Sequence, residues 1–131
     1  MAYYFHTIIE KSSFDEVLEK LTEALKSEGF GILTEIDVQA TFKKKLDVDF
    51  KKYKILGTCN PEFAYKAITV EDKIGVFLPC NIVVEENSEG NIEVSAVDPI
   101  ASMISVQNKK LGSLALEVQE KLKNVIRNLK V

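Results

Sequence analysis

Apolar residues recur along the chain with two different periods, and each period predicts one kind of element. Two stretches show the three-to-four-residue spacing of an amphipathic helix. The first begins after Ser13, which forms a capping box with Glu16, and ends at Gly29. The second fills the C-terminal part of the chain, with apolar positions at Leu111, Leu114, Ala115, Val118, Leu122, Val125, Ile126 and Leu129. We therefore predict two long amphipathic helices.

Stretches rich in β-branched and aromatic residues predict strands. They cover residues 3–10, 32–36, 53–59, 74–86 and 92–97, and the fourth stretch is broken at Pro79. The turn residues from Asn87 to Asn91 join the last two strands into a hairpin. Positions 74–78 and 82–84 show little polar alternation, which favours burial on both faces or a dimer interface.

Short helices are expected in three of the connections. Asp37 is suited to cap one that carries Val38, Phe42 and Leu46 on one side. The pairs Asn60-Pro61 and Asp98-Pro99 each place a capping residue before a proline at the favoured first helical position.

This order of elements predicts one domain of the α+β class over residues 1–131. Strands joined by hairpins with few crossover helices indicate a mainly antiparallel sheet. The two long helices are expected to cover one face of that sheet. The other face then needs polar residues or a partner, and a homodimer is our hypothesis.

Composition narrows the class of protein further. Lys and Arg number 17 against 20 for Asp and Glu, so the net charge of −3 disfavours nucleic acid as a partner. No apolar run has the length of a membrane span, and the N-terminus lacks the pattern of a signal peptide. Two cysteines do not make the disulfide framework of a small secreted domain. These features predict a cytoplasmic protein.

The candidate chemistry centres on two Cys-Asn pairs, Cys59-Asn60 and Cys80-Asn81. Each pair lies where a strand is expected to meet a turn. The helix predicted after Cys59 would favour the thiolate and bound anions at its first turn. If the two strands are neighbours, both thiols and both amides could converge on one pocket. Structural cysteines and a redox-labile disulfide are the alternatives.

Two weaker arrangements add carboxylates. Glu35 and Asp37 are two positions apart at a strand end, a spacing that suits a general acid or base, although Asp37 is already explained as a cap. A zinc site of both cysteines, His6 and a carboxylate such as Asp98 or Glu35 would require folding to gather them, and we assign no metal.

Three separated segments support a family comparison: Gly29–Val38, Tyr53–Pro61 and Leu78–Asn81. Together they resemble the family of domains of unknown function numbered 302. The resemblance implies a compact α+β domain, similar in outline to the TATA-box-binding protein, with a curved antiparallel sheet, helices on one side and frequent dimerisation. It also implies that the site residues are Glu35, Asp37, Cys59, Asn60, Cys80, Asn81 and Asp98. No activity or cofactor follows from it.

Three functional hypotheses remain open. The leading one is a ligand-binding domain whose pocket, lined by the two Cys-Asn pairs, holds a small molecule, an anion or a metal. The second is a thiol-dependent or redox enzyme using Cys59 or the Cys59/Cys80 pair, with Glu35 or Asp37 carrying a proton. The third is a dimeric interaction module whose cysteines belong to the core.

Overall fold

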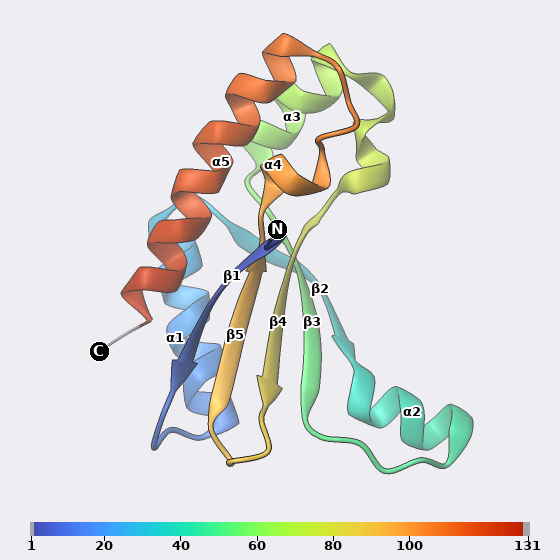
Figure 1. Ribbon diagram of the computed structural model, residues 1–131, viewed down its shortest axis with the longest axis vertical. Helices are drawn as coiled ribbons and strands as arrows, with labels where there is room; N and C mark the ends of the chain where they lie inside the picture. Colours follow the sequence, from blue (N-terminus) through green and yellow to red (C-terminus); the bar gives the residue numbers. More distant parts are fainter. Residues whose placement is uncertain (1, 130–131) are drawn as a thin grey trace.

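A computed structural model describes residues 2–129 as a five-stranded antiparallel sheet with helices on one face and at one end (Figure 1). The strand order is β1-β5-β4-β3-β2, so β1 and β2 form the two edges. The elements along the chain are β1 (Tyr4–Ile9), α1 (Phe14–Ser27), β2 (Gly31–Asp37), α2 (Val38–Leu46), β3 (Tyr53–Cys59), α3 (Pro61–Val70), the 3₁₀ helix η1 (Asp72–Phe77), β4 (Cys80–Glu86), β5 (Ile92–Val97), α4 (Pro99–Ser102) and α5 (Lys109–Asn128). The predicted α+β class and the antiparallel sheet are confirmed.

Three of the expected helix starts, at Ser13, Asp37 and Asp98, are confirmed by their hydrogen bonds. The Ser13 hydroxyl accepts from the Glu16 amide at 3.1 Å, and the Glu16 carboxylate accepts from the Ser13 amide, which completes the capping box of α1. Asp37 accepts from the Ala40 amide at 2.9 Å at the start of α2. Asp98 accepts from the Ile100 amide at 3.0 Å at the start of α4. In each case a side chain satisfies an amide that has no partner within its helix.

The strand expected over residues 74–78 was wrong, because this segment forms the 3₁₀ helix η1. A strand here would have to extend β4 toward the N-terminus and pair with β3, but β3 ends at Cys59. The pairing of the two strands already ends at Cys80, the first residue of β4, which lies opposite Thr58. Pro79 supplies no amide to extend the ladder further. The apolar residues before it therefore form hydrogen bonds of the 3₁₀ type, such as that from the Leu78 amide to the Gly75 carbonyl at 3.1 Å.

The two faces of the sheet differ in what covers them. Figure 1 shows α1 and the second half of α5 on one side. On that side the inward positions of the strands pack with both helices into a cluster that we call the main core, which includes Val17, Leu21, Leu25, Leu56, Ile82, Val84, Val94, Leu122 and Val125. The prediction that two amphipathic helices cover one face is thus confirmed. On the opposite side, residues 2–129 place only α2, at the lower end of the sheet, and the rest of this face, which we call the open face, has no helix over it.

A second hydrophobic cluster lies beyond the end of the sheet, where α3, η1, α4 and the start of α5 meet (Figure 1). We call it the cap cluster. Its buried members are Ala67, Ile74 and Leu111, with partly buried Val70, Leu78, Met103, Val106 and Leu114 packed against them. Helix α5 contributes to both clusters and connects them. No helix within residues 2–129 has the length and apolar character needed to cross a membrane.

Candidate ligand-binding cavity

A cavity of about 320 Å³ lies between the main core and the cap cluster. Its floor is the end of the sheet, where β3 and β4 contribute Thr58, Cys59 and Cys80. Its walls come from α3, α4 and the middle of α5, with almost entirely apolar side chains. This size falls at the lower end of small-molecule sites in proteins.

Both cysteines line this cavity, because the strands that carry them are neighbours and turn away at the same sheet end. Cys59 is the last residue of β3 and is half-buried, whereas Cys80 is the first residue of β4 and is buried. The Thr58 hydroxyl donates to the Cys80 carbonyl at 2.8 Å, which joins the two strand ends. Both thiols are free, with no disulfide between them.

The environment of Cys80 determines its charge. Burial raises the pKa of the Cys80 thiol to about 11, and the neighbouring Cys59 adds to this shift because two thiolates repel. Cys80 is therefore a neutral S–H group near neutral pH. It offers a polarisable surface and a weak donor, and it is poorly suited to act as a nucleophile.

Asn60 also lines the cavity, but its side chain does not have the expected capping role. It occupies the N-cap position of α3, with Pro61 following, yet it makes no side-chain bond to that helix. Its amide group instead donates to the Glu28 carbonyl at the end of α1, at 3.3 Å. Asn60 thus connects α3 with a carbonyl that has no partner within α1.

Asn81 lies on the open face, away from the cavity. Successive residues of a strand point to opposite faces, so Cys80 and Asn81 face different sides of β4. His6 is also on the open face, where its Nδ1 lies 3.0 Å from a Glu93 carboxylate oxygen. The structure therefore brings together Cys59, Asn60 and Cys80, and it separates Asn81 and His6 from them.

The three acidic candidates serve local contacts outside the cavity. Glu35 pairs with the Lys54 ammonium group, and this hydrogen bond raises the pKa of Lys54. Asp37 caps α2 at the other end of the sheet (Figure 1). Asp98 caps α4 and also accepts from the Gln119 side chain of α5 at 3.1 Å. None of the three borders both thiols.

These placements bear on metal chemistry as well. Within residues 2–129, no group of three or more His, Cys, Asp or Glu side chains is arranged to hold a metal ion. The zinc site considered from the sequence is not assembled, because His6 lies across the sheet from the cysteines and Asp98 and Glu35 are engaged elsewhere.

The remaining walls of the cavity consist of apolar residues that the sequence analysis did not identify as site residues. Phe63, Ala64 and Ala67 come from α3, Met103 follows α4, and Ala115 and Val118 come from α5. Apolar residues at helical spacing do not reveal whether they meet a neighbour or an empty space. The one available signal is size, because Ala115 stands on the apolar side of α5 among the larger Leu111 and Leu122.

The fold and the cavity together define a class: a small α+β domain with an open antiparallel sheet and an apolar hollow between two hydrophobic clusters. A family model described as domain of unknown function DUF302 matches residues 5–129. The chain belongs to this family, as the sequence motifs predicted. Curated proteins give no match.

A solved structure supports the same assignment. The chain is similar to the uncharacterized conserved protein DUF302 from Bacillus stearothermophilus, known from a crystal structure, with 25% sequence identity. The match covers 99% of this chain and 100% of that chain, with a TM-score of 0.91. Neither the family nor this similar protein is described with an activity.

Proposed function

We propose that this protein binds a small apolar molecule in the cavity between the main core and the cap cluster. The observation that carries the proposal is the cavity itself, which is about 320 Å³ in volume and which residues 2–129 line with no ionisable side chain except two thiols. A charged group buried there would lose its hydration without gaining a partner. The part of the ligand that enters the cavity is therefore uncharged.

The thiols contribute polarisable contacts to such a ligand. Cys80 is 9% exposed and its thiol has no hydrogen-bond partner among residues 2–129. A buried S–H group without a partner is suited to an aromatic ring or a carbonyl oxygen of a ligand. A buried Cys80 carries little thiolate at neutral pH, so this thiol is better suited to contact a ligand than to act as a nucleophile.

Fluorescence titration with N-phenyl-1-naphthylamine, a neutral apolar dye, tests the proposal. Replacing Ala67, which lines the cavity, by Phe fills part of the space, and we expect the affinity for the dye to fall at least tenfold. Ala64→Phe changes the same wall at a half-buried position and covers the case in which Ala67→Phe does not fold. Glu19→Phe, at an exposed position of α1, adds the same ring away from the cavity and the open face and is the control. Dye binding unchanged in both cavity variants would refute the proposal.

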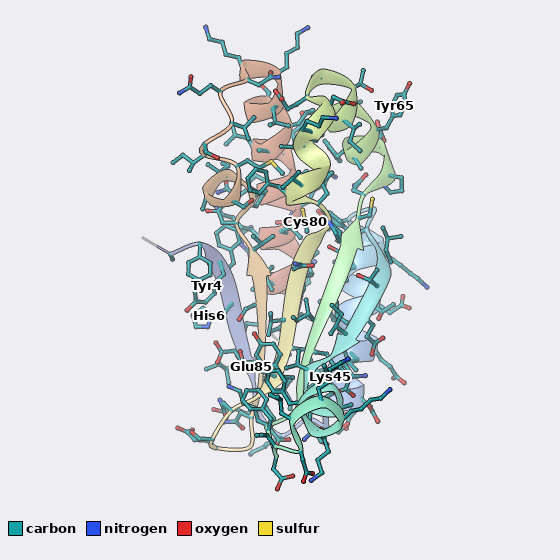
Figure 2. The ribbon with its side chains drawn as sticks, turned by 90° about the vertical axis from the view of Figure 1, so that its right-hand side faces the viewer. Tyr4, His6, Lys45, Tyr65, Cys80 and Glu85 are labelled. Atoms are coloured by element: carbon teal, nitrogen blue, oxygen red, sulfur yellow. The ribbon has the colours of Figure 1, made fainter. Side chains whose placement is uncertain are left out.

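We also propose that a second copy of the chain covers the open face, including α2. Helix α2 has no buried residue, although it carries Phe42 and Leu46. Exposed apolar side chains continue from it across the face, including Tyr4, Ile8, Ile36 and Phe50. Figure 2 shows Tyr4, His6 and Glu85 on this uncovered side of the sheet, with Lys45 of α2 at its lower end.

The charges on the open face favour a copy of itself as the partner. Lys51 pairs with Glu85 at 2.6 Å, and His6 lies against Glu93, so the acidic residues have basic neighbours. Two such balanced surfaces can meet without strong like-charge repulsion.

Sedimentation equilibrium at micromolar concentration tests the dimer. We expect a dimeric mass for the wild type and a monomeric mass for Ile36→Asp, which buries a charge at the proposed contact. Val76→Asp introduces the same charge at an exposed position of η1 and should remain dimeric. A monomeric wild type would refute the proposal.

A further inference from the structure

A second apolar hollow adjoins the ligand cavity. It is a groove of about 490 Å³ between the chain segment that follows α4 and the first half of α5. Its lining includes Ile100, Ile104, Val106 and Leu116, and it opens to solvent, where Ile104 is 71% exposed. Among the described residues, no acidic side chain lines it.

The groove and the cavity share one partition. Met103, Leu111 and Ala115 line both hollows. Leu111 and Ala115 are buried on α5, whereas Met103 is partly buried at the end of the short α4. Methionine is unbranched and changes rotamer readily, so Met103 is the member of this partition that can move aside.

The outer end of the groove differs from the cavity in charge. Lys109, the first residue of α5, lines the groove, whereas the cavity has no basic side chain. Lys109 takes part in none of the ion pairs formed within residues 2–129. The path from the cavity through Met103 to Lys109 therefore runs from an apolar, uncharged interior to an exposed cation.

We propose that the ligand is a single-chain amphiphile with an anionic headgroup of the fatty-acid type. Its chain passes Met103 into the cavity, and its carboxylate stays in the groove beside Lys109. This inference rests on the proposed function, because it assigns a ligand class to the same cavity. It adds the groove, the partition and the cation as determinants of specificity.

Isothermal titration with decanoate and decan-1-ol tests the role of Lys109, because the two probes share a chain length and differ in headgroup charge. An exposed ion pair supplies a modest gain, so we expect decanoate to bind about threefold to fivefold more tightly. Lys109→Met should abolish this preference. Lys110→Met removes a neighbouring exposed lysine that does not line the groove, and it should keep the preference.

Methyl NMR of isoleucine-labelled protein tests the path of the chain. Ile68 lines the cavity and Ile104 lines the groove, whereas Ile36 lies on the open face. Decanoate should shift the signals of Ile68 and Ile104 and leave Ile36 unchanged.

Three outcomes would overturn the inference: equal affinity for the two probes, equal behaviour of the two lysine variants, or a shift at Ile68 without one at Ile104. If N-phenyl-1-naphthylamine still binds in a manner sensitive to Ala67→Phe, such a result rejects only the amphiphile and retains the cavity as a binding site. If the dye and decanoate both fail to bind, the proposed function itself fails.

Discussion

The main core and the cap cluster are built from the same kinds of residue, but their side chains are buried to very different extents. In the main core, a sheet and two helices bury a continuous set of large side chains, among them Leu21, Leu25, Ile82 and Leu122 with no exposed surface. In the cap cluster only Ala67, Ile74 and Leu111 are buried. Apolar side chains on the outside of the cap region, such as Val76 and Ile104, remain largely exposed.

This difference explains where the cavity forms. Strand pairing holds the inward side chains of the sheet in register, so the helices can pack closely against them. Helix α3, η1 and α4 are short, have no sheet between them, and form the cap cluster with residues from the first half of α5. The space left between the two clusters is the cavity. Stability is therefore expected to come from the main core, and adaptability to a ligand from the cap.

The largest predicted effect follows directly from this comparison. Leu21→Ala removes a fully buried side chain of the main core, and we expect the free energy of unfolding to fall by roughly 3–5 kcal/mol. Leu111→Ala makes the same change in the cap cluster next to an existing cavity. Its cost should lie near the lower limit for such substitutions, about 2 kcal/mol. Urea denaturation of both variants measures the difference, and equal losses would contradict the unequal packing.

Hydrogen exchange can show which elements of the chain become less stable in the Leu111→Ala variant. Leu111→Ala is expected to speed exchange in α3 and η1 and to leave β4 and β5 near wild-type rates, because local opening of the cap does not require the main core to unfold. Faster exchange throughout the sheet would show that the two clusters unfold as one unit.

The raised pKa of Cys80, on the floor of the cavity, predicts that the free energy of unfolding depends on pH in the alkaline range. Its folded-state pKa is raised from 9.0 to about 11, so the folded state retains the thiol proton more firmly than the unfolded state. Stability from this group is present below pH 9 and is lost as the pH rises through 11, by about 2–3 kcal/mol in total. Cys80→Ala should flatten that part of the curve of unfolding free energy against pH. An unchanged alkaline slope would show that Cys80 is not its source.

Much of the main core could be predicted from the sequence, because its signals are local. The capping box at Ser13, the turn after Asn87 and the helical spacing of α5 each determine an element without reference to distant residues. The strand expected over residues 74–78 failed because its fate depends on a partner strand that ends at Cys59. β-Branched composition does not reveal where a partner stops.

In the candidate site too, some features could be predicted from the sequence and others could not. The convergence of Cys59 and Cys80 at one sheet end could be anticipated, because each closes or opens a neighbouring strand. The separation of Asn81 from Cys80 follows from strand alternation, once the strand is known to begin at Cys80. The groove and its partition at Met103 could not be anticipated, since they depend on how α4 and α5 pack.

Gly57 tests how closely the sheet end is packed where the main core gives way to the cap. A methyl group on Gly57 would clash with Thr34 and would lie 2.7 Å from Pro79, the residue that leads into β4. Gly57→Ala is therefore expected to destabilise the fold by about 1–3 kcal/mol, the typical cost of overpacking. Gly75→Ala, with no atom near the added methyl group, is the matched control for thermal denaturation. Equal melting temperatures would show that Thr34 and Pro79 adjust freely.

The smallest predicted effect concerns Asn60, a side chain that lines the cavity and joins the two regions by a hydrogen bond. The amide of Asn60, at the start of α3, satisfies the Glu28 carbonyl at the end of α1. Asn60→Ala leaves that carbonyl without this partner and should cost about 1 kcal/mol. Asn81→Ala, on the open face, should change the unfolding free energy by less than about 0.5 kcal/mol. Because Asn60 anchors the first turn of α3, its loss should also speed hydrogen exchange in α3 more than in α1. A larger increase in α1 would instead show that the hydrogen bond mainly stabilises α1, in the main core.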